Sequence, residues 1–426
     1  MKAMSYSLII LISLLFSCKK EIPQPPDPCT NPPCNTDTLP KEILWQLPSQ
    51  PDSSTCLSNY PLIYNNEVIF TKFLCEYGVP VFFIDKTTGK QIDYNYDVKM
   101  GSTAEKLSQY IYSNYYIVHN WHYTYIFDLE QHKLIKTWNI RDFGAEGEPR
   151  TNGIAYWMFQ GWSTQAGVGK NYFSSSMVRR NIITSAFDTI CTIKSDECYT
   201  PTLEAPAFWI TPQNDTVIIF HNGQYRFGGN PCKMPAGYRT DLYAYNITKD
   251  KMEWTAQDIA ITKQASVHLP VIFDNKVFFQ GANEVFVFDC FTGQLIWSRY
   301  FPGESFFNTN AVLAEGKFIL KSESDRMIAV DAGTGATVWD NPTAGHSNTN
   351  MIYYKGKVYY ETGQNGLGVI RALRVDDGVV TWTWFPNNYP KFSNASYGLC
   401  GIAIDQQTGL LYTHDRRFMQ CIRIPE

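Results

Sequence analysis

The sequence has little of what usually carries catalysis or charge recognition. It contains 7 histidines in 426 residues, no Cys-Cys dipeptide and no Gly-x-Ser-x-Gly element, so a nucleophile elbow of the hydrolase type is excluded. Acidic and basic residues nearly balance, with 40 Asp and Glu against 36 Lys and Arg, and no long basic run occurs. Nucleic acid and anionic membrane surfaces are therefore not expected partners.

Hydrophobic runs long enough to span a bilayer are also missing from the pattern. The apolar run over residues 8–16 is too short to cross a membrane and is typical of the central region of a signal peptide. It ends in Leu15-Phe16-Ser17-Cys18, which resembles a bacterial lipoprotein box. This resemblance implies a signal peptide over residues 1–17 and a lipid on Cys18, with a cleaved secretory form as the alternative.

Residues 18–41 are rich in proline and polar residues, a composition that favours a semi-extended tether over a packed element. Lys19-Lys20-Glu21 is similar to the charged segment that follows the lipidated cysteine in surface lipoproteins of the Bacteroidetes group. We therefore expect a cell-envelope protein that is anchored to the outer membrane through its lipid, facing either the periplasm or the cell surface.

What the chain has in place of these features is a repeat. Four segments of similar sequence end in tryptophan, at Trp254, Trp297, Trp339 and Trp382, in steps of 43, 42 and 43 residues. A period of this length holds one four-stranded blade of a β-propeller.

The sequence of each repeat predicts two β-hairpins. In one copy, the apolar run 327–330 predicts a buried strand, residues 331–335 a turn, and residues 336–339 the returning outer strand. Asp331 can accept bonds from backbone amides ahead of it, and Gly335 suits a position with φ above zero. The preceding half of each unit, such as residues 310–320, predicts another tight hairpin.

The turn and outer strand resemble the pyrroloquinoline-quinone-like (PQQ-like) repeat, Ala-x-Asp-x-x-Thr-Gly-x-x-x-Trp. Residues 329–339 match that consensus at every position. In the family, the tryptophan ties neighbouring blades together, and lipid-anchored propellers similar to BamB, of the outer-membrane β-barrel assembly machinery, carry such repeats. The resemblance implies a structural docking role for Trp45, Trp138, Trp254, Gly293, Trp297, Gly335, Trp339, Gly378 and Trp382.

We predict an all-β fold, a single propeller of four-stranded antiparallel blades over residues 42–426. Eight blades are favoured and seven are the alternative, because the region 139–200 is hard to divide. The C-terminal stretch supplies three strands without a tryptophan hairpin, and residues 42–47 around Trp45 read as an isolated outer strand. We expect this N-terminal strand to complete the last blade and close the ring of a monomer.

Ten cysteines remain after Cys18, an even number for an oxidising compartment, so disulfides are expected. The sequence does not fix their connectivity. The candidate pairs are Cys29 with Cys34, Cys56 with Cys75, Cys191 with Cys198, and Cys400 with Cys421.

Two long insertions are rich in aromatic residues, and long loops on a rigid scaffold are where binding function concentrates. The residues that could contact a ligand there are Trp157, Trp162, Tyr225, Arg226 and Phe227. The alternative is that these side chains cover the mouth of the propeller and pack on each other.

No cofactor or metal is expected, and a quinone-dependent dehydrogenase is disfavoured because the adjacent cysteines of that family are missing. We predict a non-catalytic, lipid-anchored propeller that binds envelope proteins as a scaffold. A surface protein that binds glycan and an enzyme with a site in the propeller channel are the alternatives, since propellers host all three.

Overall fold

The structure is a computed structural model. It describes residues 40–48, 60–71, 79–98, 108–119, 123–139, 151–154, 156–165, 173–194, 199–226, 238–262, 269–306, 310–345, 349–364, 367–386, 397 and 401–425. Everything stated below refers to these residues. Among them, no helix has the length and apolar character that crossing a membrane requires.

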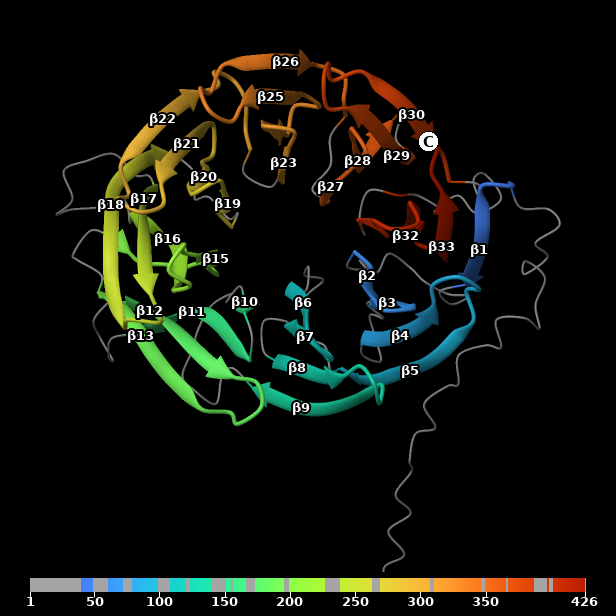
Figure 1. Cartoon of the computed structure of the whole chain (residues 1–426), viewed down its shortest axis with the longest axis horizontal. Helices are drawn as coiled ribbons and strands as arrows, with labels where there is room; N and C mark the ends of the chain where they lie inside the picture. Colours follow the sequence, from blue (N-terminus) through green and yellow to red (C-terminus); the bar gives the residue numbers. More distant parts are fainter. Residues whose placement is uncertain are drawn as a thin grey trace, which may run out of the picture.

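The strands form eight antiparallel sheets arranged in a ring (Figure 1). Blade 1 contains β2 (Leu62–Tyr64), β3 (Glu67–Thr71), β4 (Val79–Asp85) and β5 (Gln91–Val98). Blade 2 contains β6 (Ser108–Tyr112), β7 (Tyr115–His119), β8 (Tyr123–Asp128) and β9 (Lys133–Asn139). Blade 3 contains β10 (Thr151–Ile154), β11 (Trp157–Gln165), β12 (Phe173–Asn181) and β13 (Phe187–Lys194). Blade 4 contains β14 (Tyr199–Thr200), β15 (Ala207–Ile210), β16 (Thr216–Arg226), β17 (Tyr238–Asn246) and β18 (Lys251–Thr262).

The second half of the ring is more regular. Blade 5 contains β19 (Val271–Phe273), β20 (Lys276–Gln280), β21 (Glu284–Asp289) and β22 (Leu295–Tyr300). Blade 6 contains β23 (Ala311–Ala314), β24 (Lys317–Lys321), β25 (Met327–Asp331) and β26 (Thr337–Asn341). Blade 7 contains β27 (Met351–Tyr354), β28 (Lys357–Gln364), β29 (Leu367–Arg374) and β30 (Val380–Trp384). Blade 8 contains β31 (Ala403–Ile404), β32 (Leu410–His414), β33 (Phe418–Arg423) and β1 (Ile43–Pro48).

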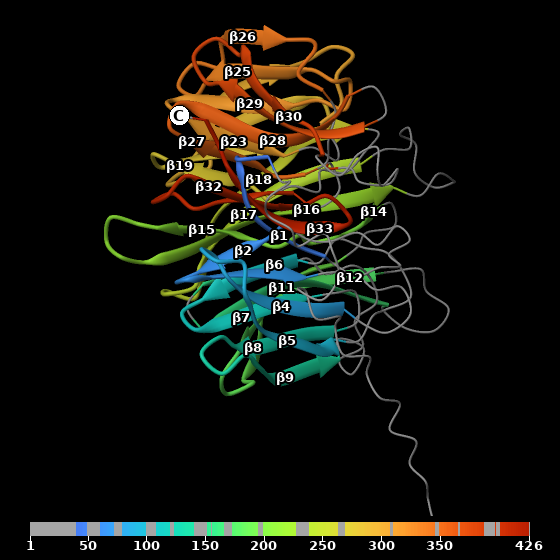
Figure 2. The ribbon, with the colours of Figure 1, turned by 90° about the vertical axis from the view of Figure 1, so that its right-hand side faces the viewer.

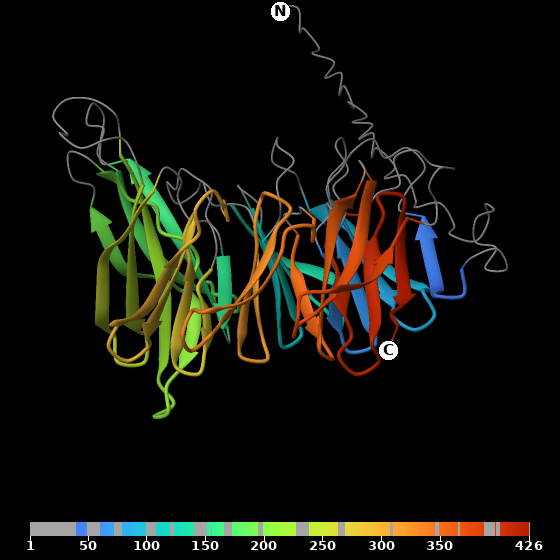
Figure 3. The ribbon, with the colours of Figure 1, turned by 90° about the horizontal axis from the view of Figure 1, so that it is seen from above.

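The molecule is an eight-bladed β-propeller, as predicted, and it has the shape of a disc (Figures 2 and 3). In each blade the first strand lies toward the centre and the last strand at the rim (Figure 1). The first strands of several neighbouring blades contact each other, such as β2 with β6 and β23 with β27. Blade 4 departs from the four-stranded pattern, because β14 and β15 both pair with the long strand β16.

The hydrophobic core is divided into slabs, one between each pair of neighbouring blades. The cluster around Phe278 of blade 5 and Phe318 of blade 6 is one example, with the two rings 5.2 Å apart. Middle strands such as β20 and β24 are buried on both faces, which explains their continuous apolar runs. A blade is therefore stable only between two neighbours, and the ring as a whole forms the core.

The N-terminal strand closes the ring, as predicted. β1 pairs antiparallel with β33, and Trp45 lies opposite Cys421. The backbone N–H of Arg423 donates to the carbonyl of Glu42 at 2.7 Å. The outermost strand of blade 8 thus comes from the opposite end of the chain to its other three strands, so folding of that blade requires both ends.

In blades 1, 2, 5 and 6 the turn before the outer strand is held by one aspartate side chain. Asp331 Oδ1 accepts bonds from the N–H of Thr334 at 2.8 Å and from the hydroxyl of the same residue at 2.8 Å. Asp85 holds Thr88 in the same way, at 2.7 and 2.8 Å. These donors stabilise the ionised carboxylates and lower their pKa values, chiefly through the Thr88 amide for Asp85 and the Thr334 hydroxyl for Asp331.

We expect acid to destabilise the propeller through these turns. Because their folded pKa values lie below the ordinary value of about 3.9, the two carboxylates contribute stability above that pH and lose it as the pH falls through the folded pKa. Urea unfolding at about pH 5 and pH 3 measures the loss. D331N should have a lower free energy of unfolding than the unchanged chain near neutral pH. Its free energy of unfolding should also fall less between about pH 5 and pH 3. If acid lowers the free energy of unfolding equally in both proteins, the Asp331 turn is not the source of the acid sensitivity.

Candidate functional site

Four of the predicted tryptophans lie directly on a glycine of the next blade. The pairs are Trp45 with Gly89, Trp254 with Gly293, Trp297 with Gly335, and Trp339 with Gly378. Each glycine has a φ between 68 and 72°, and a Cβ added to it would lie 2.5–2.7 Å from an indole ring atom. Glycine is required here both for its left-handed backbone and for the close approach of the ring.

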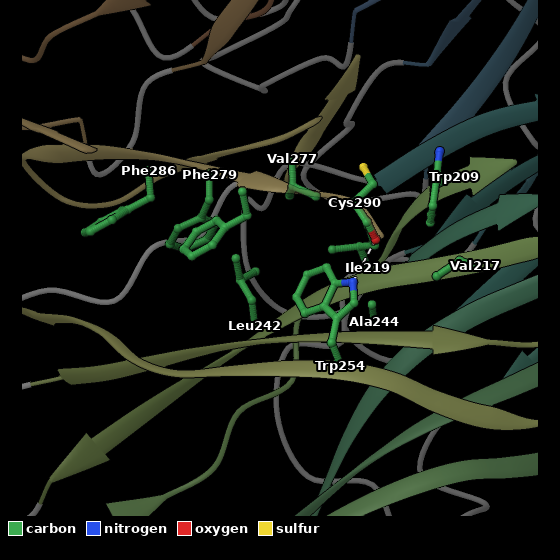
Figure 4. Packing of buried hydrophobic residues seen from close by; sticks show 11 residues of the cluster. Trp209, Val217, Ile219, Leu242, Ala244, Trp254, Val277, Phe279, Phe286 and Cys290 are labelled. Carbon is green, nitrogen blue, oxygen red and sulfur yellow. Dashed lines mark hydrogen bonds between the residues drawn. The ribbon is translucent and has the colours of Figure 1, made fainter. Parts of the chain in front are cut away.

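Each of these indoles also donates a hydrogen bond across the blade interface. Trp254 Nε1 reaches the carbonyl of Cys290 at 2.7 Å (Figure 4), and Trp339 Nε1 reaches that of Val375 at 2.7 Å. The bonds from Trp45 and Trp297 measure 3.1 and 3.3 Å. The acceptor is always the residue after the turn Asp or its replacement, so a single side chain satisfies a turn carbonyl and fills the gap between two sheets.

Trp138 does not occupy the docking position. The docking residue lies just beyond a β-bulge in the outer strand. In β22 this residue is Trp297, and in β9 it is Lys136. The Lys136 ammonium donates to the carbonyl of Ile183 at 2.7 Å and to the hydroxyl of Ser185 at 3.0 Å. Trp138 lies further along the strand and packs against the guanidinium of Arg180, 4.5 Å from its ring centre. An ammonium group therefore bridges blades 2 and 3 where an indole bridges others.

The interface between blades 1 and 2 uses another substitution. Asp93 stands at the docking position of β5, and His132, with a φ of 52°, replaces the turn glycine of blade 2. The imidazole of His132 lies 3.7 Å from Asp93 and 3.1 Å from Glu67, and it stacks on Phe83. The sequence contained the signal, because the docking residue follows the turn Asp by eight positions in every matching copy.

Trp382 stands at the docking position of β30, opposite Ala372. Its ring lies 6.2 Å from Tyr359 and 5.9 Å from Trp384. Gly409, in the turn between the first two strands of blade 8, faces the hydroxyl of Tyr354. Aromatic rings of blade 7 thus pack against apolar side chains of blade 8 such as Leu411 and Ile422.

At the junction of blades 8 and 1, which we call the ring seam, Lys86 forms several contacts. Its carbonyl accepts bonds from Trp45 and from the Tyr412 hydroxyl at 3.2 Å, and its ammonium lies 2.9 Å from Asp405. Burial alone would raise the pKa of Asp405, but hydrogen bonding and charge from Lys86 outweigh it and lower that pKa. The seam is therefore held by an ion pair in addition to the strand pairing.

A belt of buried positions follows the second strand of every blade. In each second strand we number from the residue that pairs with the turn Asp or its replacement, such as Glu67 opposite Asp85 in blade 1. The fifth residue of this count is polar in all blades except blade 3. The residues of this polar belt are Thr71, His119, His221, Gln280, Lys321, Glu361 and His414, and blade 3 has Gly161 at the same position; all are buried.

Three residues of the polar belt hold segments that connect blades. Gln280 donates to the carbonyl of Phe306 at 2.8 Å, and Lys321 to that of Thr349 at 3.3 Å. Glu361 accepts a bond from the N–H of Gly401 at 2.8 Å. These contacts give buried ionisable groups a structural role. Within the described residues, no group of three or more His, Cys, Asp or Glu is placed to bind a metal ion.

The predicted ligand-binding residues are placed only in part. Trp157 is half-buried at the start of β11, with the guanidinium of Arg179 5.0 Å from its ring centre. Trp162 lies opposite Ser176 within the pairing of β11 and β12. The insertion that contains Tyr225 and Arg226 proves to be strand at these residues, because Tyr225 pairs with Tyr238 and Arg226 with Tyr199. Phe227 lies outside the described residues.

The predicted disulfides that the structure tests are wrong. Cys191 and Cys421 are free thiols, so neither Cys191–Cys198 nor Cys400–Cys421 forms. Cys421 is buried on β33 among the apolar side chains next to Trp45 and Tyr412, where it acts as a small core residue, and burial raises its pKa to about 12. Cys290 is also free. The pairs Cys29–Cys34 and Cys56–Cys75 lie outside the described residues, as does Cys18.

Fold and repeat together define a β-propeller of PQQ-like repeats. A family model described as outer membrane protein assembly factor BamB matches residues 292–399. A curated protein of that name from Moranella endobia (strain PCIT) is 33% identical over 111 residues, which cover 26% of this chain and 27% of that protein. The chain thus matches about a quarter of the length of this relative, and its repeats there are BamB-like.

Solved structures agree on the fold across most of the chain. BamB from Moraxella catarrhalis has a TM-score of 0.55 at 9% identity and covers 90% of this chain and 99% of its own. A europium-containing methanol dehydrogenase has a TM-score of 0.60 at 12% identity and covers 86% of this chain and 84% of its own. Since both an assembly factor and an enzyme share the architecture, the fold alone does not decide the function.

We expect G378A to destabilise the protein much more than G316A. Both glycines have φ near 70°, but an added Cβ meets Trp339 at 2.5 Å in the first case and nothing within 4 Å in the second. Overpacking should add about 1–3 kcal/mol to the backbone cost that both variants share. Urea denaturation of the two variants measures the difference. Equal losses would show that the tryptophan contact does not constrain the turn.

We expect K136M to lose about 1–3 kcal/mol of unfolding free energy, because it removes the ammonium that donates to Ile182, Ile183 and Ser185. K133M on the same strand, at an exposed position, is the matched control. Thermal unfolding of both variants checks this. If K133M costs as much as K136M, the bridging role of Lys136 is wrong.

Proposed function

We propose that the protein is a lipid-anchored propeller of the cell envelope that serves as an interaction scaffold for other envelope proteins. Residues 1–17 are its signal peptide, residues 18–41 its tether with the lipid on Cys18, and residues 42–426 the propeller. The observation that carries the proposal is the BamB-like repeat over residues 292–399. The relative with that repeat is named as an outer membrane assembly factor.

The contacts of the described residues support this role. The docking tryptophans, Lys136 and the polar belt bond to backbone groups of the next blade or of the segment leading into it. These side chains are used to stiffen the ring, which is what a scaffold requires. Exposed apolar side chains are distributed over the rim and the turns, including Phe273, Phe291 and Tyr300, and such surfaces suit binding of a partner protein.

The experiment is crosslinking in cells that produce the full chain, followed by mass spectrometry of the recovered partners. We expect one or a few envelope proteins to be recovered reproducibly from the unchanged chain. C18A, which removes the proposed lipid site, should move the protein out of the outer-membrane fraction and reduce that recovery. Retention of C18A in the membrane fraction would contradict the anchor.

Two further measurements separate the alternatives. Protection of the intact protein from protease added to whole cells would contradict a surface glycan-binding role, whereas cleavage would contradict a periplasmic scaffold. Titration of the purified protein with pyrroloquinoline quinone, followed by its absorbance, tests the enzyme alternative. Stoichiometric binding with turnover of an alcohol would overturn the scaffold proposal.

A further inference from the structure

One face of the disc is made of short turns, and we call it the turn face. It holds the turns between the first and second strands and between the third and fourth strands of the blades (Figure 3, lower side). The chain enters β1 from this face, because Ile43 at the start of β1 pairs with Ile422 near the end of β33. The N–H of Ile43 also donates to the carbonyl of Pro40 at 2.9 Å. The 39 residues that precede Pro40 therefore join the propeller on the turn face of blade 8.

Three tyrosines gather on the turn face where blades 2 and 3 meet. Tyr112 and Tyr115 pair across the turn between β6 and β7, and both pack on the apolar cluster between these two blades. Tyr156 lies in the turn between β10 and β11, where its ring meets that of Tyr112 edge-on at 5.3 Å. Its side chain is 46% exposed. We call Tyr112, Tyr115 and Tyr156 the tyrosine patch.

The tyrosine patch offers hydroxyl donors on an uncharged surface. None of its three hydroxyls forms a hydrogen bond to the described part of the chain. The other turn of blade 3, residues 182–186, contains no charged residue, and it adjoins the patch because the N–H of Ile182 donates to the carbonyl of Tyr156 at 2.9 Å. Aromatic rings with available donors suit a proline-rich ligand, since the polyproline II backbone has no internal hydrogen bonds and leaves its carbonyls available.

We propose that the tyrosine patch binds a proline-rich segment of this same chain, residues 23–28. The segment reads Pro-Gln-Pro-Pro-Asp-Pro, a composition that favours the extended form that aromatic surfaces bind. Pro28 precedes Pro40 by 12 residues, which span about 37 Å in a proline-rich chain. Packed sheets lie about 10 Å apart, so crossing blades 1 and 2 from β1 to the patch takes about 30 Å. The connection is therefore long enough.

This inference goes beyond the scaffold function and does not depend on it. Residues 23–28 remain in the chain whether Cys18 carries a lipid or the leader is cleaved to give a secretory form. Phe273 of blade 5 is also exposed on the turn face, but it has no hydroxyl and is followed by the charged Asp274. A docked segment would shorten the tether and cover the tyrosine patch, so a partner that binds there would have to displace it.

Site-specific photocrosslinking of the purified full chain tests the proposal. A photoreactive phenylalanine analogue replaces Tyr156, or Phe273 in the control, which is 49% exposed and is also separated from blade 8 by two blades. The chain with the analogue carries heavy isotopes and is mixed with unlabelled chain before irradiation. We expect position 156 to crosslink to a heavy peptide that contains residues 23–28, and position 273 not to do so.

The other outcomes of this experiment contradict the proposal. A crosslink from position 156 to an unlabelled peptide would show that a second copy occupies the patch. A crosslink to another segment of the chain, equal crosslinking from both positions, or none from position 156 would also overturn the docking of residues 23–28.

Paired proline substitutions check the segment independently. P25A/P26A alters the docked segment, and P32A/P33A alters the connection that follows it. Neither pair lies in a strand of the propeller, so neither should change its fold. With the analogue at position 156, P25A/P26A should lower the crosslink yield about tenfold, as a loss of about 1.4 kcal/mol of docking free energy would, and P32A/P33A should not. An unchanged yield with P25A/P26A, or an equal fall with P32A/P33A, would overturn the proposal and leave the scaffold function untouched.

Discussion

The structure depends on one contact that recurs around the ring, in which an outer strand of one blade places a side chain on the turn of the next. A blade buries neither of its faces alone, so its stability comes from the two slabs of core that it shares with its neighbours. The indole on a glycine turn is the tightest form of this contact, because the ring approaches the backbone and also satisfies a buried carbonyl. Closure through Trp45 and Lys86 extends this contact across the junction of the two chain ends.

The same position tolerates different chemistry where the surrounding turn changes with it. Where the turn residue is Ser185, the docking residue is Lys136, and where the turn residue is His132, the docking residue is Asp93. These residues lose the apolar area of an indole but form ion pairs or hydrogen bonds across the interface. The blades with degenerate repeats are therefore held more by polar contacts than those with the full consensus. This shows why a repeat can diverge in sequence while its geometry persists.

Several buried ionisable side chains serve the ring itself, which leaves the outer surface for recognition. The polar belt uses Lys321, Glu361 and Gln280 to hold connections between blades. Blades differ both in their docking contacts and in the side chains exposed at the rim, such as Leu295 and Tyr300 of blade 5. Function in such a protein is expected from differences among blades more than from the shared repeat.

The sequence by itself determined the period, the two hairpins of each repeat and the closing strand, because these depend on local alternation of apolar residues and on turn chemistry. It favoured eight blades over seven, and the structure decided for eight. The sequence did not determine the docking role of Lys136, the pairing of Asp93 with His132, or the free state of Cys191 and Cys421. The spacing of eight residues from the turn Asp locates Lys136 and Asp93 in the sequence. Their partners on the next blade, and the burial of Cys421, were decided by the tertiary structure because they bring together residues far apart in the chain.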